Sequence, residues 1–299
     1  MELVVRQISG LGNQLFQYAA GRYYARQYGA SLRLALDPPE KAFSYGIPRP
    51  FLLSHFRITA PASPETALEE FYLTPRRKLG YASALVRSVL GLAIRRETLS
   101  ERHTFIPDLG VSGHLRRLYI FGYWQTYRIP EAIEEDLRAE FAFREPPTGK
   151  NAELLQQIRA AQSAVSLHIR RGDYASAAEG NRVLPMSYYE EAIASLRREL
   201  AEPTFFIFSD DPEFARANLP QDLDTVFVTH NDDITSFEDL RLMSHCSHHI
   251  IANSSFSWWG AWLNPDKDKI VFAPRQWMMT PTSFFPELNP PSWRLLDVV

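Results

Sequence analysis

The residues best suited to chemistry lie in four polar clusters, each of which follows an apolar run. The clusters span residues 168–173, 209–211, 229–233 and 253–257, and the first reads His-Ile-Arg-Arg-Gly-Asp. The planar guanidinium of Arg170 can grip a diphosphate through paired hydrogen bonds. Serine hydroxyls and main-chain amides at a helix N-terminus, as expected in the fourth cluster, suit the same group. These residue types together predict a site for a diphosphate ligand.

A nucleoside attached to that diphosphate would need its own partner. Guanine presents adjacent N–H donors on one edge, which a single carboxylate can accept together, so Asp210 or Asp211 would suit this base. A diphosphate that leaves during a reaction gains negative charge in the transition state. A fixed Arg170 could stabilise that charge in the way that a metal ion does elsewhere.

The same residues also have purely structural interpretations. Arg171 could pair with Asp173 on the surface, so that at most one of the two arginines touches a ligand. Asp211 precedes a proline and could cap the helix that follows, and residues 253–255 could cap the next helix. Three tryptophans of that helix are expected in the core rather than as sugar platforms: Trp258, Trp259 and Trp262.

Three short motifs match ligand-binding patterns, but their contexts argue against a site. Arg-Gly-Asp at 171–173 is the tripeptide of adhesion ligands, yet no cysteine-stapled loop displays it. Asp-Leu-Asp at 222–224 matches a metal-binding motif but falls in an expected surface connection. His-Cys-Ser-His-His at 245–249 straddles a helix–strand junction that would point its side chains apart. The sequence therefore predicts no metal site.

Alternating strands and helices must position these clusters. Short apolar runs predict strands at 164–169, 204–208, 225–229, 248–252 and 269–273. Helical periodicity predicts helices at 151–162, 187–200, 212–218, 236–246 and 256–263. This alternation is typical of a parallel sheet with helices on both faces. Because ligands bind beside the carboxyl ends of such strands, we expect the four clusters to share one rim.

The N-terminal half opens as strand, glycine turn, helix and strand, an arrangement that suits anions. We expect strands at 2–9 and 31–36 and, between them, a helix capped by Asn13. A further strand is expected at 118–121, followed by a polar–aromatic turn and a helix near 130–141.

A basic stretch at 76–97 is predicted to be helical, with arginines and lysines around apolar positions. It could rest on anionic lipid as a peripheral membrane contact, or pack on the first domain with its arginines in solvent. The segment 145–149, rich in proline, is the expected linker. We therefore expect a first domain at 1–148, a second at 149–275, and a tail at 276–299 that could pack back on the first.

Length and composition bound the remaining possibilities. The chain has 299 residues, enough for two domains, and its formal net charge of −3 gives no global sign of nucleic acid as a partner. Cys246 is the single cysteine, so no intramolecular disulfide can form, which fits a reducing compartment. The sequence begins without the pattern of a signal peptide or membrane anchor. A cytoplasmic protein, at most associated with the inner face of the membrane, is expected.

Three blocks of sequence resemble the α-1,2-fucosyltransferases of glycosyltransferase family 11. They are Gly-Leu-Gly-Asn-Gln-Leu-Phe-Gln-Tyr-Ala-Ala-Gly at 10–21, His-Ile-Arg-Arg-Gly-Asp-Tyr at 168–174, and Ile-Ala-Asn-Ser-Ser-Phe-Ser-Trp-Trp-Gly-Ala-Trp at 251–262. Phe-Ile-Phe-Ser-Asp-Asp at 206–211 supports them. The blocks occur in the family's order and span most of the chain. Residues 37–110 match nothing in the pattern, which leaves the choice of acceptor open.

The resemblance implies a fold, a reaction and two substrates. The fold is GT-B, an α/β architecture with two Rossmann-like domains facing a central cleft. The reaction is inverting transfer of fucose from GDP-β-L-fucose to the 2-hydroxyl of a terminal β-galactoside, on an oligosaccharide or a lipid-linked glycan. GDP-fucose is a co-substrate, and no cofactor or metal is implied.

The resemblance also implies roles for individual residues. Arg170 would hold the β-phosphate, with His168 and Asp210 near the guanosine. Asp173 is the nominee for the base that takes the hydroxyl proton, although it could instead orient the arginines. The remaining residues fall into two groups. The nucleotide-sugar side adds Ser209, Asn253, Ser254, Ser255, Phe256 and Ser257, and the acceptor side has Gly12, Asn13 and Gln14.

Two other functions remain open from sequence. One is a fucosyltransferase that forms another linkage, although the blocks at 10–21 and 251–262 weigh against it. The other is a nucleotide-sugar-binding protein without turnover, such as a sensor or an adhesion module.

Overall fold

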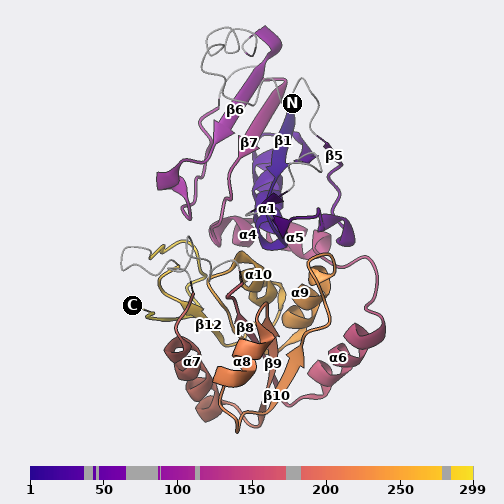
Figure 1. Ribbon diagram of the computed structural model, residues 1–299. Helices are drawn as coiled ribbons and strands as arrows, with labels where there is room; N and C mark the ends of the chain where they lie inside the picture. The colour runs from indigo at the N-terminus through magenta and orange to yellow at the C-terminus, as the bar shows by residue number, and fades with distance from the viewer. Residues whose placement is uncertain are drawn as a thin grey trace. The chain divides into compact units, whose positions relative to one another are not determined.

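The computed structural model describes residues 1–36, 43–44, 47–64, 87, 89–111, 115–172, 183–277 and 284–298. The chain divides into two compact units, Met1–Ala142 and Phe143–Val299. Each unit has a parallel β-sheet with helices packed against it (Figure 1). The predicted α/β class with two Rossmann-like halves is confirmed. The first unit ends at Ala142, whereas the sequence predicted residue 148.

The first unit is built on a five-stranded sheet in the order β5-β2-β1-β7-β6. Its strands are β1 (Glu2–Gln7), β2 (Ser31–Leu36), β5 (Ala62–Pro64), β6 (Leu92–Arg96) and β7 (Arg117–Phe121). The other elements are α1 (Leu11–Gln27), the hairpin β3 (Phe43–Ser44) and β4 (Ile47–Pro48), two 3₁₀ turns at Leu53–His55 and Leu99–Glu101, and the short helices α4 (Arg128–Ala132) and α5 (Glu134–Glu140). α1 packs closely on β1, because a Cβ at Gly21 would lie 2.6 Å from Val5.

Two helices of this unit differ from their predictions in detail. α1 begins at Leu11 after an extended Gly10, so Asn13 lies in its first turn instead of capping it. The Asn13 side chain is used elsewhere, in hydrogen bonds to Ser9 and Gln125. The helix predicted near 130–141 is two helices, because the backbone leaves helical geometry at Ile133 (φ −133°, ψ 36°).

The prediction of a basic helix over 76–97 is wrong for its last part, where β6 runs from Leu92 to Arg96. Leu92 and Ile94 alternate onto a core cluster of the first sheet, while the strand pairs with β7 along its length. The apolar residues before Gly91 suggested a helical period, and Gly91 itself turns the chain at φ +65°. Residues 76–86 and 88 lie outside the described residues.

The second unit is built on a six-stranded sheet in the order β10-β9-β8-β11-β12-β13. Its strands are β8 (Ser163–Ile169), β9 (Pro203–Ser209), β10 (Thr225–Val228), β11 (His248–Ile250), β12 (Val271–Pro274) and β13 (Arg294–Leu296). All neighbouring pairs are parallel. All but β13 were predicted, with bounds close to those observed. The strand order reverses between β8 and β11, and such a switch point is where parallel sheets bind ligands.

Helices cover both faces of this sheet. They are α6 (Gly149–Ala160), α7 (Met186–Glu199), α8 (Pro212–Asn218), α9 (Ser236–His245) and α10 (Ser255–Leu263). One core cluster joins α7 to Val165 and Leu167 of β8, and a second joins α6 and α9 to Ala164 of the same strand. Every residue of β8 is therefore buried, as expected of a central parallel strand.

The C-terminal segment differs from the predicted tail. β13 pairs with β12, and the ring of Trp293 lies 5.4 Å from that of Trp258, so the end of the chain belongs to the second unit. The sequence missed this strand because so short a segment gives no measurable period. Within the described residues, the helices are too short or too polar to cross a bilayer.

Candidate functional site

The carboxyl ends of β8 and β9 bring the first two polar clusters together. Ile169 and Ser209 are partners in the ladder, so Arg170 and Asp210 follow them side by side. Nη1 of Arg170 lies 3.0 Å from Oδ2 of Asp210. The other carboxylate oxygen accepts a hydrogen bond from the main-chain N–H of Arg171 at 2.8 Å. Arg170 is thus held at the switch point, where an anion would bind.

The neighbouring arginine has a different environment. Arg171 lies with Nε 3.2 Å from Oδ2 of Asp211, and its guanidinium lies 3.6 Å from the centroid of the Phe214 ring. Asp211 also caps α8, because Oδ1 accepts from the N–H of Phe214 at 3.1 Å. The capping interpretation of Asp211 is therefore confirmed. The partner of Arg171 is Asp211, whereas the predicted partner Asp173 lies outside the described residues.

His168 lies deeper, near the end of β8. Nδ1 is 2.8 Å from Oγ of Ser257, which ties β8 to the first turn of α10. Burial lowers the pKa of His168 to about 3, and the charge of Arg170 acts in the same sense. The imidazole is therefore neutral at pH 7 and offers a hydrogen bond rather than a positive charge.

The fourth cluster shapes the start of α10. Ser254 is the N-cap and accepts from the N–H of Phe256 at 3.4 Å, which confirms the capping interpretation. Asn253 donates to the main-chain oxygen of Trp277 at 3.0 Å. The ring of Phe256 lies 5.9 Å from that of His168. The tryptophans of α10 are buried, as predicted, and pack on one another.

Ser209 supports the turn that carries the two aspartates. Its Oγ accepts from the main-chain N–H of Asp211 at 3.0 Å. Ser255 is the first residue of α10 and is partly exposed. The structure thus gathers the predicted residues of β8, β9 and α10 on one rim of the second unit.

In the first unit the predicted residues lie at the start of α1. Gln14 is 2% exposed, donates to the main-chain oxygens of Ser9 and Pro50 (both 2.9 Å), and accepts from the N–H of Leu52 at 3.0 Å. Its amide therefore ties α1 to a neighbouring loop. Gly12 is buried in the first turn, and Asn13, which is half-buried, accepts from Gln125 at 2.7 Å.

Glu97 is a residue of this unit that the sequence did not single out. Its carboxylate follows β6 and accepts from the N–H of Tyr123 at 2.8 Å and of Trp124 at 3.0 Å. Trp124 has φ +54°, a conformation that side chains other than glycine rarely adopt. Glu97 therefore holds the polar–aromatic turn in place. No signal in the sequence marked it, because it fell at the end of the stretch interpreted as a helix.

Comparisons with known proteins give this arrangement a family. Residues 102–287 match Glycosyl transferase family 11. The chain belongs to this family. An O-antigen biosynthesis glycosyltransferase, WbnK of Escherichia coli, is 31% identical over 90% of this chain and 92% of its own. An alpha-1,2-colitosyltransferase of Escherichia coli is also 31% identical, over 92% of each chain.

More distant similarities extend to animals and plants. A galactoside alpha-(1,2)-fucosyltransferase 1 of Ateles belzebuth is 25% identical over 82% of this chain and 64% of its own. Among solved structures, the fucosyltransferase NodZ from Bradyrhizobium superposes with a TM-score of 0.50 over 89% of this chain and 94% of its own, at 13% identity. A FUT1 mutant of Arabidopsis thaliana in complex with GDP gives 0.51 over 97% and 74%, at 12% identity. These structures share the GT-B fold with the family 11 chain.

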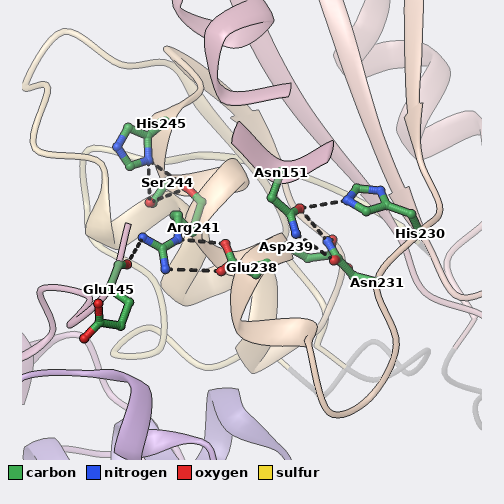
Figure 2. Close-up of polar contacts among 9 residues, drawn as sticks. All are labelled: Glu145, Asn151, His230, Asn231, Glu238, Asp239, Arg241, Ser244 and His245. Atoms are coloured by element: carbon green, nitrogen blue, oxygen red, sulfur yellow. Dashed lines mark hydrogen bonds and ion pairs between the residues drawn. The ribbon is translucent and has the colours of Figure 1, made fainter. Parts of the chain in front are cut away.

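The remaining polar cluster of this family 11 glycosyltransferase, at the end of β10, is engaged with α6 and α9 (Figure 2). Asn151 accepts from Nε2 of His230 (2.8 Å) and exchanges hydrogen bonds of 3.0 Å with Asn231. Asn231 also donates to Asp239 at 2.6 Å, and burial raises the pKa of Asp239 to about 7. The described partners of this third cluster are thus structural neighbours, and no bond to Arg170 or His168 is found among them.

The motifs that resembled metal sites are structural in this glycosyltransferase. Nδ1 of His245 lies 2.8 Å from the main-chain oxygen of Arg241, and Nδ1 of His249 lies 2.8 Å from Oγ of Ser166 in the core. The pair at 222–224 is split between Arg197 and Thr204. Across the described ranges, no three histidine, cysteine or acidic side chains converge as metal ligands.

Proposed function

We propose that this family 11 glycosyltransferase transfers L-fucose from GDP-β-L-fucose to the 2-hydroxyl of a terminal β-galactoside, with inversion at the anomeric carbon. The observation that carries the proposal is the position of Arg170. It stands at the switch point of the second sheet, held by Asp210, in a chain of this family. A relative with galactoside alpha-(1,2)-fucosyltransferase activity in its name supports the linkage.

In the proposed reaction, the galactose 2-oxygen forms a bond to C1 of fucose from the face opposite GDP. The bond between C1 and the diphosphate oxygen breaks, and its electron pair leaves with GDP. Arg170 stabilises the negative charge that develops on the β-phosphate. The reaction therefore needs no metal, because a fixed guanidinium does this work.

The hydroxyl proton must leave at the same time. His168 is a poor base for it, because burial keeps its pKa near 3 and its Nδ1 is engaged with Ser257. Its role in the proposal is to shape the site near the guanosine. Asp173 remains the proposed acceptor of the proton, and it lies outside the described residues.

The test is an assay of the purified protein with GDP-fucose and lactose, with and without EDTA, followed by linkage analysis of the product. A product fucosylated at the galactose 2-position, formed equally with EDTA, is the expected result. A different linkage would favour the alternative fucosyltransferase, and loss of activity in EDTA would overturn the metal-free mechanism. Binding of GDP-fucose without product across a panel of galactosides would favour a binding protein without turnover.

A second candidate is transfer of colitose to the same position. The observation that favours it is the alpha-1,2-colitosyltransferase of Escherichia coli, which is 31% identical over 92% of each chain. Both sugars would use the same diphosphate grip, so the site around Arg170 does not separate them. Competition between GDP-fucose and GDP-colitose for one acceptor decides, and the donor with the higher kcat/KM is the substrate.

A further inference from the structure

We propose that Asp210 is a positioning residue that locks the turn 170–172, and that residue 172 must be glycine because of this carboxylate. The inference rests on the proposed function of Arg170 and goes one step behind it. Sequence reasoning placed Asp210 beside the guanosine. Its contacts in the structure point inward, to the residues that carry and follow the arginine.

The two oxygens of Asp210 grip two different parts of one turn. Oδ2 lies 3.0 Å from Nη1 of Arg170, while Oδ1 accepts from the main-chain N–H of Arg171 at 2.8 Å. One rigid carboxylate thus fixes the guanidinium relative to the backbone that bears it. Because both side chains are only about a quarter exposed, 24% and 22%, the pair is shielded from water and is stronger than a surface pair.

Gly172 completes the arrangement by leaving space. A Cβ built on this residue would lie 2.6 Å from Oδ2 of Asp210 and 3.1 Å from its Cγ. Any larger residue would therefore push the carboxylate away from Arg170. The requirement for glycine here is one of space, since the neighbour is the functional end of Asp210.

Tyr189 closes the turn from the side of α7. This residue is 1% exposed, and burial raises the pKa of its hydroxyl. The Asp210 carboxylate raises that pKa further, and the main-chain N–H of Arg170 opposes it, so both groups lie close to the phenol oxygen. The turn is thus held from β9 on one side and from α7 on another.

The adjacent pair provides a matched control. Asp211 binds Arg171 at 3.2 Å on the same rim, with the same chemistry, but Arg171 stacks on Phe214. The two pairs therefore differ in which arginine they serve. Asp211→Asn keeps the oxygen that can cap α8 and removes only the charge.

The experiment measures kcat, KM and nucleotide specificity for Asp210→Asn, Gly172→Ala, their double variant and Asp211→Asn. We expect each of the first two changes to lower kcat by about tenfold or more, since Arg170 would no longer be aimed at the charge of the transition state. Asp211→Asn should stay within about threefold of wild type. Circular dichroism and thermal melting establish that each variant is folded.

The double variant separates a shared cause from two independent ones. If Gly172→Ala acts by displacing Asp210, the double variant should lose no more than about threefold beyond the worse single variant. Losses that multiply, to about a hundredfold or more, would overturn the proposed coupling. Wild-type turnover alone tests the proposed function, so the two failures are distinguishable.

Specificity for the base distinguishes positioning from recognition of guanine. Inosine diphosphate lacks the 2-amino group that a carboxylate would accept from guanine. If Asp210 positions Arg170, Asp210→Asn should keep the wild-type ratio of inhibition constants for GDP and inosine diphosphate. Collapse of that ratio in Asp210→Asn, with the ratio intact in Gly172→Ala, would assign Asp210 to the base and overturn the inference.

Discussion

Two adjacent arginines at the end of β8 show how far residue type determines role. Arg170 and Arg171 have the same side chain and the same kind of carboxylate partner. The second lies flat on the Phe214 ring and joins β8 to α8, whereas the first is held at the switch point. The sequence indicated that at most one would touch a ligand, but only the ring contact shows which one is structural.

Replacing each arginine by alanine should therefore give different defects. We expect Arg170→Ala to lose more than about tenfold in kcat/KM, or ~1.4 kcal/mol of transition-state stabilisation, with an unchanged melting temperature. Arg171→Ala should keep most activity and lose about 1 kcal/mol of stability, because it loses a stacked cation and a half-exposed ion pair. Kinetics and thermal melting of both variants check this. Greater loss of kcat/KM in Arg171→Ala would reverse the assignment.

At the scale of elements, a buried acidic residue joins three segments of the first unit. Glu140, at the end of α5, accepts from the hydroxyl of Tyr18 at 2.7 Å and from Nε of Arg22 at 2.9 Å, both on α1. Its other oxygen accepts from the hydroxyl of Thr59 at 3.2 Å. The residue is only 7% exposed, so these bonds are protected from water.

Glu140→Ala should therefore be strongly destabilising. Its removal leaves Arg22 and Tyr18 without their shared acceptor, and we expect a loss of about 3–5 kcal/mol in the free energy of unfolding. The control is Glu134→Ala, which breaks the exposed pair with Arg138 on the same helix and should cost about 0.5 kcal/mol or less. Urea unfolding measures both. Similar losses in the two variants would show that the buried network contributes little.

The elements also show where sequence patterns succeed and fail. The strands β8 and β9 were predictable because continuous, largely apolar runs are typical of central parallel strands. β6 was not, because its residues are mostly half-buried and follow a segment with helical spacing. In the site, the pairing of Arg170 with Asp210 depends on the register of β8 and β9, which residue types do not encode.

At the scale of the whole molecule, the second unit was more predictable than the first. Its sheet alternates regularly with helices, whereas β5 and β6 of the first sheet are short edge strands reached through irregular segments. The unit proposed to grip the nucleotide is thus constrained by a periodic pattern. The first unit, which carries the proposed acceptor residues Asn13 and Gln14, relies on individual side-chain bonds that only the structure reveals.

Buried histidines make the folded protein sensitive to acid. Burial lowers the pKa of both His168 and His249 to about 3. The unfolded chain takes up protons on these residues near pH ~6.5, whereas the folded chain does not. Stability from this source is full above about pH 6.5 and is lost as the pH falls toward 3, by at most about 1.4 kcal/mol per pH unit for each histidine.

Asp239 acts in the opposite sense, and its replacement should expose the effect of the histidines. Burial raises its pKa to about 7, so the folded protein holds a proton that the unfolded chain, with a carboxyl pKa of about 3.9, releases. Its contribution is full below about pH 4 and is lost as the pH rises to 7, which offsets the histidines between about pH 5 and 6.5. We expect Asp239→Asn to lose stability more steeply with acid than wild type, by up to about 1.4 kcal/mol per pH unit, in urea unfolding over that range. Asp222→Asn, at an exposed carboxylate whose pKa is lowered by Arg197, should follow the wild-type slope, because that group titrates only in stronger acid. Equal slopes for Asp239→Asn and wild type would show that Asp239 does not hold this proton in the folded state.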